Sequence, residues 1–230
     1  MSDLLGVATI CLTALTQASL QLSFGALILL YNASLGRHKK KRTRYLTRSY
    51  VLGVASISFL VLSSFAFLIS IFTGNGLPLP VLFVVAGVLI ASSLVMQFLY
   101  FRKGKNTELW LPRNISRYIA RRAKKSDDAI ETFSLGMLSS LVEFPLSIAL
   151  YLIAANAITR MSAGMQLVGL LVYTLLACSP LLYLKLKIRS GKNALEMQAW
   201  RRKNKSFLKT IACGNFLTLA FFLIGFWIIQ

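Results

Sequence analysis

Six long apolar stretches divide the chain and limit what it can fold into. They cover approximately residues 4–35, 50–73, 78–101, 132–158, 163–186 and 207–229. A helix needs about 20 mostly apolar residues to cross the hydrocarbon of a bilayer. The sequence therefore predicts an all-α, polytopic integral membrane protein with about six transmembrane helices, forming a single membrane domain over residues 1–230. The first stretch is overlong and carries Gln17 and Gln21 in its middle, so it is expected to be strongly tilted, broken or re-entrant.

The basic residues lie almost entirely in alternate connections between these stretches. The chain has 26 Lys and Arg against 7 Asp and Glu, and all of the basic residues except Arg160 follow the first, third or fifth stretch. The positive-inside rule places those three connections in the cytoplasm and both termini outside the cell membrane. The excess positive charge indicates contact with anionic lipid headgroups. Nucleic acid is not an expected partner, because the aromatic residues lie mostly in the apolar stretches, away from the basic clusters.

The second basic connection, about 106–130, carries an amphipathic pattern. Its apolar residues recur at helical spacing while basic residues occupy another face: Leu111, Ile115, Tyr118 and Ile119 form the first, and Arg113, Arg117 and Arg121 the second. Trp110 precedes them. This pattern predicts a helix that lies at the lipid headgroups.

A short internal similarity suggests two related halves. Residues 22–27 read LSFGAL and residues 133–138 read FSLGML, so that Ser, Gly and Leu coincide at an offset of 111. With three helices in each half, the halves (about 1–105 and 131–230) must be inverted relative to each other, as in many secondary transporters. This register predicts that Gly25 and Gly136 lie where the first and fourth helices pack together.

The segment 133–152, FSLGMLSSLVEFPLSIALYL, resembles the Phe-x-x-Gly-x-x-Ser…Pro segment of the lysine-exporter/DsbD-type membrane superfamily. That superfamily includes CcdA-like electron carriers, amino-acid and metal-ion exporters and lipid-addressing GAP proteins. The resemblance implies six or so helices arranged as three plus three. The electron carriers place a Cys beside the Pro of this segment, whereas this chain has Glu143 and Phe144 before Pro145. The resemblance therefore implies an exporter-like or lipid-handling branch without the redox cysteines.

Several kinds of chemistry are excluded by the residues that the sequence lacks. The only histidine, His38, lies in a basic cluster, and the three cysteines, Cys11, Cys178 and Cys213, are scattered through apolar stretches. No Asp, Glu and His cluster suits a metal ion, and there is neither a Walker A motif nor a Gly-rich dinucleotide turn. The sequence predicts no enzyme activity, no cofactor and no metal site.

Glu143 is the only acidic residue well inside an apolar stretch. Placing an ionised carboxylate near the middle of a membrane costs about 3 kcal/mol, so such residues usually face a cavity or a partner. Pro145, two residues on, removes one backbone hydrogen bond. Polar residues of the first and fourth stretches complete the candidate transport or ligand set: Glu143, Pro145, Ser139, Ser140, Gln17, Gln21 and Asn32. The alternative is a protonated Glu143 that hydrogen-bonds to neighbours such as Gln17 or Asn156 and only holds helices together.

These patterns favour a secondary transporter or exporter of a small solute, ion or lipid-related molecule. One alternative is a non-catalytic membrane scaffold or subunit that docks a larger complex through its basic face. A transmembrane electron carrier is a third possibility and would require cysteine pairing. The expected partners are anionic lipid headgroups and a small solute or ion, and either a homo-oligomer or a membrane complex is compatible with the sequence.

Overall fold

The computed structural model describes residues 3–20, 23–35, 40–74, 76–95, 97, 118, 121–123, 125–126, 128–189 and 203–225. These residues are almost entirely helical, and no strand occurs among them. The prediction of an all-α fold is therefore confirmed.

The described helices fall on the six apolar stretches, two of which are divided. In chain order they are α1 (Asp3–Leu20), α2 (Ser23–Leu35), α3 (Lys40–Thr73), α4 (Leu79–Val95), α6 (Ala129–Thr159), α7 (Ala163–Ala177), α8 (Ser179–Arg189) and α10 (Lys205–Leu223). Among these, α1, α3 and α6 are long and apolar enough to cross a membrane, and α7 with α8 adds a fourth crossing if the bent pair is one span. α2, α4 and the apolar part of α10 are shorter.

The bend between α7 and α8 is caused by a proline. The two helices meet at an angle of 50°. Pro180, the second residue of α8, has no backbone N–H to continue the hydrogen-bond ladder of α7. The ladder closes instead at Cys178, whose N–H donates to the Thr174 carbonyl at 3.0 Å, and restarts where Leu182 N–H donates to the Cys178 carbonyl at 3.0 Å.

A glycine turn joins α3 to α4 and is held by a buried side chain. Gly74 and Gly76 have φ of 68° and 135°, backbone conformations that favour glycine. The Leu77 N–H donates to Asn156 Oδ1 of α6 at 2.7 Å. Asn156 is fully buried, so its amide ties this turn to the end of α6 rather than joining Glu143.

The closest helix packing is between α3 and α6. A Cβ atom on Gly136 would overlap the Tyr50 carbonyl oxygen, and one on Gly53 would overlap the Phe133 carbonyl oxygen. The two helices can approach this closely only because both side chains are missing. The expectation that Gly136 crosses the helix of Gly25 is corrected here: the backbone nearest to Gly136 belongs to α3, and Gly25 lies half-buried in α2.

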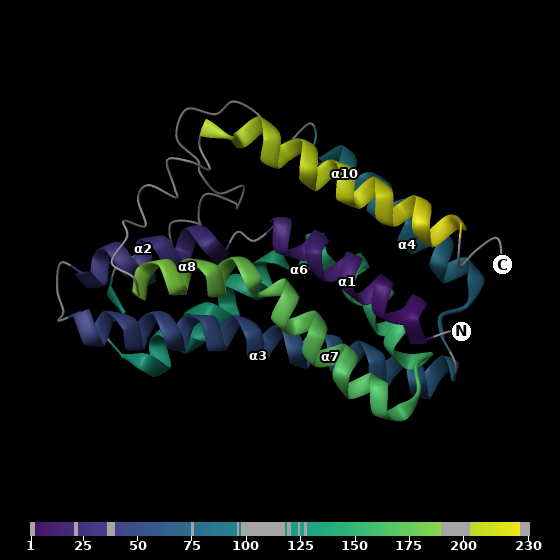
Figure 1. The fold of residues 1–230 in the computed structure, drawn as a ribbon, viewed down its shortest axis with the longest axis horizontal. Helices are drawn as coiled ribbons and strands as arrows, with labels where there is room; N and C mark the ends of the chain where they lie inside the picture. The colour runs from purple at the N-terminus through teal and green to yellow at the C-terminus, as the bar shows by residue number, and fades with distance from the viewer. Residues whose placement is uncertain are drawn as a thin grey trace.

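The helices lie roughly along the length of the molecule (Figure 1). The start of α1, the end of α10 and the α3–α4 and α6–α7 turns lie at one end. The end of α2, the starts of α3 and α6 and the end of α8 lie at the other. α4 and α10 pack against each other and cover α1 and α6. The end of the molecule that holds the starts of α3 and α6 is also the end that carries the basic residues Arg44, Arg48, Lys185 and Lys187.

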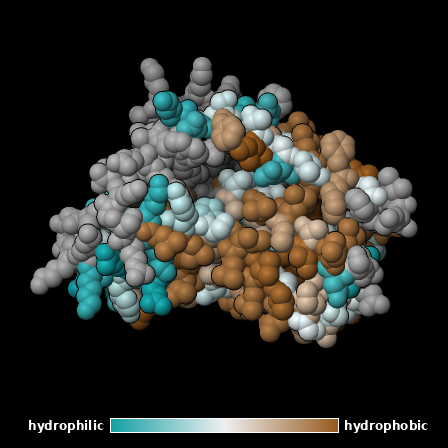
Figure 2. Space-filling view, viewed as in Figure 1, coloured by the Kyte–Doolittle hydropathy of each residue, from teal (hydrophilic) through white to brown (hydrophobic). Residues whose placement is uncertain are grey.

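Apolar side chains cover the middle of the outer surface. Figure 2 shows them gathered over the centre and right of the face, while hydrophilic side chains gather at the left, where α3 begins and α8 ends. The exposed apolar residues come from several helices and include Leu60, Phe67, Ile71, Phe83, Val84, Leu167 and Leu175. A continuous exposed apolar surface of this kind indicates contact with lipid.

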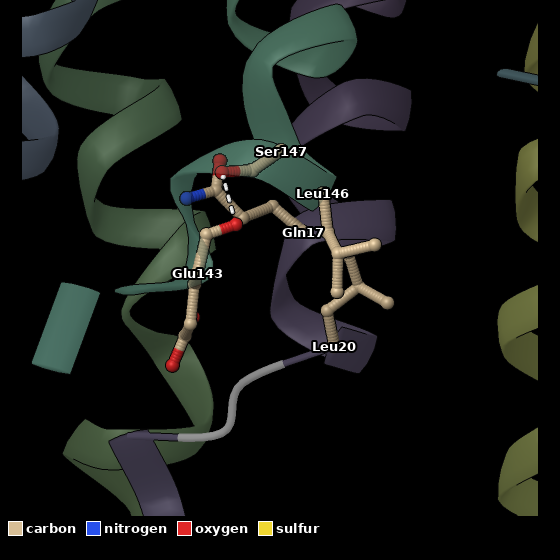
Figure 3. Close-up of a pocket in the computed structure, with 5 residues that line it drawn as sticks. All are labelled: Gln17, Leu20, Glu143, Leu146 and Ser147. Atoms are coloured by element: carbon tan, nitrogen blue, oxygen red, sulfur yellow. Dashed lines mark hydrogen bonds between the residues drawn. The ribbon is translucent and has the colours of Figure 1, made fainter. Parts of the chain in front are cut away.

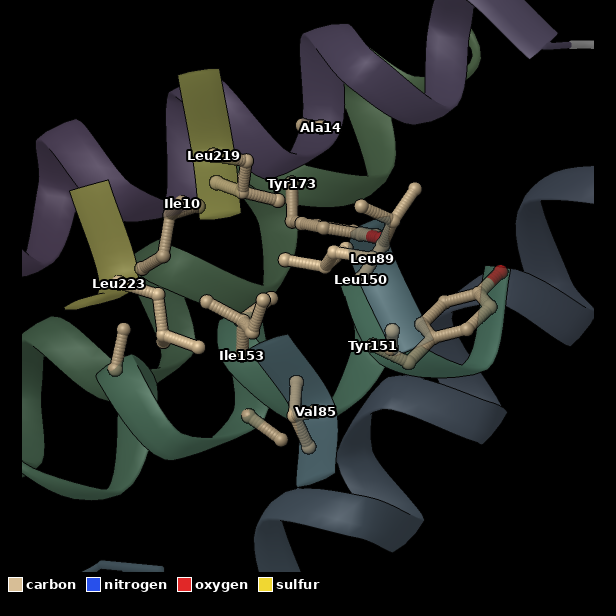
Figure 4. Packing of buried hydrophobic residues seen from close by; sticks show 14 of the residues in the cluster. Ile10, Ala14, Val85, Leu89, Leu150, Tyr151, Ile153, Tyr173, Leu219 and Leu223 are labelled. Carbon is tan, nitrogen blue, oxygen red and sulfur yellow. The ribbon is translucent and has the colours of Figure 1, made fainter. Parts of the chain in front are cut away.

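The interior contains two apolar cores that meet near the middle of α6. The larger core is built from α1, α3, α4, α6, α7 and α10 and includes Ile10, Leu89, Leu150, Tyr173 and Leu219 (Figure 4). The smaller core is built around α2 and the starts of α3 and α6, together with α8. Glu143 lies on α6 between Leu135, which belongs to the smaller core, and Ala149, the first buried α6 residue of the larger core.

Candidate functional site

Glu143 is buried and caps the start of α2. The Ser23 backbone N–H donates to Glu143 Oε1 at 2.5 Å, and the Ser23 hydroxyl donates to the same oxygen. Ser23 is the first residue of α2, so its N–H has no partner within the helix. The start of a helix carries partial positive charge and favours a carboxylate. The division between α1 and α2 thus creates the donors that receive Glu143.

A second buried network lies around Gln17 of α1. Its Nε2 donates to the Tyr151 hydroxyl at 2.8 Å, and the Tyr173 hydroxyl donates to its Oε1. The two tyrosine rings are 5.7 Å apart, centroid to centroid. Since Gln17 is used as both donor and acceptor, its amide orientation is fixed by α6 and α7 together. Tyr50 of α3 adds a third buried phenol, which donates to the Ser23 carbonyl at 3.0 Å.

Gln17 and Glu143 line the same small pocket. Its walls are Gln17 and Leu20 from α1 with Glu143, Leu146 and Ser147 from α6 (Figure 3). The Ser147 hydroxyl donates to the Glu143 carbonyl at 3.1 Å. The enclosed space holds roughly one water molecule. A space of this size is large enough for a proton or a small ion, whereas a larger solute would fit only after the helices move.

The depth of the pocket follows from the α3–α6 crossing. Exposed apolar residues of α3 run from Leu52 to Phe72, a length of about 30 Å at 1.5 Å per residue. Gly53, next to Leu52, crosses α6 at Gly136. Glu143 follows seven residues later, roughly 10 Å further along α6. The pocket therefore lies within the apolar belt, nearer to its basic end.

The other candidates take different positions. Ser139 bonds back to the Leu135 carbonyl at 2.8 Å, and Ser140 is buried nearby on α6. Pro145 is exposed on the outer side of α6, which remains helical through it. Asn32 is half-buried nine residues after Ser23 and does not line the pocket. The pocket thus brings together Glu143 and Gln17 but neither Pro145 nor Asn32.

Some candidates fall outside the part of the chain that the structure describes. These are Gln21 of the first stretch and Trp110, Arg113 and Arg117 of the second basic connection. Arg121 is described and is exposed.

Sequence reasoning missed the tyrosines and Ser147. Tyr50, Tyr151 and Tyr173 are each almost fully buried in apolar helices. A buried phenol usually finds a hydrogen-bond partner, so tyrosines in the middle of membrane stretches are a usable signal for polar networks. Ser147 could have been found as well, because it lies one helical turn after Glu143 and therefore on the same face.

The described Cys, Asp and Glu side chains are dispersed over several elements. Within the described ranges, no group of three or more His, Cys, Asp or Glu side chains is placed to hold a metal ion. The cysteines are free thiols, on α1 (Cys11), at the α7–α8 junction (Cys178) and on α10 (Cys213). Cys213 donates weakly to the Ser93 carbonyl of α4, with a sulfur–oxygen distance of 3.6 Å.

Comparison of the chain with protein-family models, with curated proteins and with solved structures finds no match. The function is therefore inferred from the geometry of the site.

Proposed function

We propose that the chain is a secondary transporter or exporter of a small solute, ion or lipid-related molecule across the cytoplasmic membrane. The observation that carries the proposal is a buried carboxylate, that of Glu143, on a residue that lines a small pocket between two helices inside an apolar belt. A buried acid that faces a cavity at membrane depth is typical of an ion or proton pathway. Glu143 acts as the ligand or coupling group, and the proposal involves no enzyme activity and no cofactor.

The proposal includes six membrane crossings arranged as two inverted three-helix repeats. Support comes from the helix pairs. If α1, α3 and α4 correspond to α6, α7 and α10, then the pair α3–α6 corresponds to α7–α1, and α1–α10 corresponds to α6–α4; all four pairs pack together. The pairs α1–α6, α3–α7 and α4–α10 each correspond to themselves and also pack. Corresponding helices run in opposite directions along the molecule (Figure 1).

The orientation follows from the basic end of the molecule, which the proposal places in the cytoplasm against anionic headgroups. In a background without native cysteines, Gly164→Cys at the α6–α7 end should react with an impermeant maleimide in intact cells. Arg44→Cys at the start of α3 should react only after permeabilisation. Both positions are exposed. The reverse pattern would show that the chain sits the other way round.

A membrane scaffold is the second candidate, and one observation favours it. Glu143 receives two hydrogen bonds from Ser23, which is what a purely structural helix contact would provide. A scaffold would keep its partners when Glu143 is replaced by Gln, whereas a transporter would lose flux. The thiol electron carrier has less support, because the three cysteines are free and lie on different elements.

Flux through the purified protein in proteoliposomes tests the proposal. Wild-type protein should move at least one solute or ion faster than protein-free liposomes do, and Glu143→Gln should abolish that difference. A folded protein with no flux in a broad screen of ions, amino acids and lipid analogues would favour the membrane scaffold over the transporter.

A further inference from the structure

We propose that the pocket is a two-sided site in which Gln17 is the repeat-related counterpart of Glu143, and which two repeat-related helix crossings close from opposite ends. The inference rests on the proposed transport function and specifies how the site is reached. Its evidence comes from the register of the two halves, from the lining of the pocket and from the positions of two close helix crossings.

The sequence gives a register for the first helices. At an offset of 126, residues 12–22, LTALTQASLQL, align with residues 138–148, LSSLVEFPLSI. Three leucines coincide, Thr13 aligns with Ser139, and Gln17 aligns with Glu143. The offset of 111 pairs Gly25 of α2 with Gly136 of α6, so it does not align α1 with α6.

A second similarity links α3 with α7 and α8. Residues 51–63, VLGVASISFLVLS, align with residues 167–179, LVGLLVYTLLACS, at an offset of 116. Gly53 coincides with Gly169, and Ser58 aligns with Thr174. The offset is ten residues smaller than for the first helices because the connection between the aligned segments is shorter in the second half.

The pocket is lined by counterpart residues in this register. Gln17 pairs with Glu143 and Leu20 pairs with Leu146, and all four line the pocket (Figure 3). Two inverted repeats are related by a two-fold axis in the membrane plane, and substrate sites lie at their interface. A pocket in which four of the five lining residues form two counterpart pairs, with Ser147 as the fifth, is the arrangement expected on that axis.

The two close crossings are counterparts as well. Gly136 corresponds to Ile10 and Gly53 corresponds to Gly169. Gly136 and Gly53 lie at the α3–α6 crossing. Their counterparts, Ile10 and Gly169, lie at a contact between α1 and α7, where a Cβ atom on Gly169 would lie 3.0 Å from the side-chain atom Ile10 Cδ1. The contact between α3 and α6 therefore has a counterpart in the contact between α1 and α7.

These crossings lie on opposite sides of the pocket. Gly136 precedes Glu143 by seven residues, and Ile10 precedes Gln17 by seven, each about 10 Å along its helix. Because α1 and α6 run in opposite directions, the α3–α6 crossing separates the pocket from the basic end, and the α1–α7 crossing separates it from the other end (Figure 1). Both crossings are closed here, which matches the water-sized space between them and describes an occluded state.

Side-specific labelling tests this arrangement. In a background with Cys11, Cys178 and Cys213 replaced by Ala, the reporter Ser147→Cys is placed in the pocket and exposed to an impermeant thiol reagent in sealed vesicles of each orientation. Gly136→Ala adds a methyl group against the Tyr50 carbonyl and spreads the α3–α6 crossing. It should raise the labelling rate by at least ~10-fold, and only from the side on which Arg44→Cys reacts.

Gly169→Leu, which overlaps Ile10 and Ile158, should raise labelling only from the opposite side. Gly87→Ala and Gly87→Leu are the matched controls, because no neighbour lies within 4 Å of a Cβ atom there, and they should leave both rates unchanged. If Gly136→Ala does not fold, Ser49→Ala replaces it, since this change only removes the hydrogen bond from Ser49 to the Ala129 carbonyl of α6.

Three labelling results would overturn the two-sided site. Both variants could raise labelling of Ser147→Cys from the same side, either variant could raise it from both sides, or neither variant could raise it from any side. The readout does not depend on transport. Side-specific access without any flux would refute the proposed function and retain the arrangement, whereas Glu143-dependent flux without side-specific access would refute the arrangement alone.

Discussion

Exchanging the two central side chains, Gln17→Glu together with Glu143→Gln, is expected to restore flux that Glu143→Gln alone reduces to the level of protein-free liposomes. The carboxylate then projects from α1 instead of α6, in both cases from a residue that lines the same pocket. A carboxylate at position 17 can accept from the Tyr173 and Tyr151 hydroxyls. An amide at position 143 can still accept from the Ser23 N–H and hydroxyl. Initial flux rates of the single and double variants in proteoliposomes measure the effect.

The control for this exchange makes the same kind of double substitution but moves the carboxylate to a residue outside the pocket. Asn32→Glu with Glu143→Gln places it on α2, at the position that an offset of 111 would pair with Glu143, and this variant should stay inactive. Rescue by Asn32→Glu, or failure of the folded Gln17→Glu double variant, would contradict the pairing of Gln17 with Glu143.

Gly136→Leu is expected to destabilise the fold by roughly 3 kcal/mol or more, because even a single methyl group there overlaps the Tyr50 carbonyl and the backbone of α3 must move. For a chain of this size that loss corresponds to a fall in Tm of about 10 °C. Thermal unfolding of the purified protein in detergent, followed by circular dichroism, measures it.

Gly87→Leu separates this packing effect from helix propensity. Gly87 lies within α4, where no atom lies within 4 Å of a Cβ atom. The substitution should therefore leave Tm unchanged or raise it slightly, since Leu is the better helix former by ~1 kcal/mol. Equal losses at both positions would show that the α3–α6 crossing contributes no special stability.

The sequence predicted the helical segments because hydrophobic length is a local property. The division of the first stretch was expected from Gln17 and Gln21, and the structure divides it between Leu20 and Ser23. The bend at Pro180 was not predicted, although a proline in an apolar stretch is a recognised cause of bending. Local composition marks where a helix can break, while neighbouring helices decide whether it does: α6 stays continuous through Pro145 and α7 ends before Pro180.

The site was predicted only in part, since it depends on which helices meet. Glu143 was singled out because an acid in an apolar stretch is costly, and the structure buries it in a pocket with Gln17. The prediction that Gly136 packs against the helix of Gly25 was wrong, because a three-residue similarity could not fix which helices pack together. Tyr151 and Tyr173 were missed since an isolated tyrosine in an apolar stretch resembles an ordinary core residue until the helix that supplies its partner is known.

The most direct test is to compare flux through wild-type and Glu143→Gln protein in proteoliposomes under an imposed pH gradient. Both proteins are purified, and their Tm values are checked to be equal before reconstitution. The account predicts that at least one solute or ion crosses with the wild-type protein above the protein-free background, and that Glu143→Gln returns the rate to that background while its Tm is kept. Flux equal to that of the wild type in a well-folded Glu143→Gln protein would contradict it.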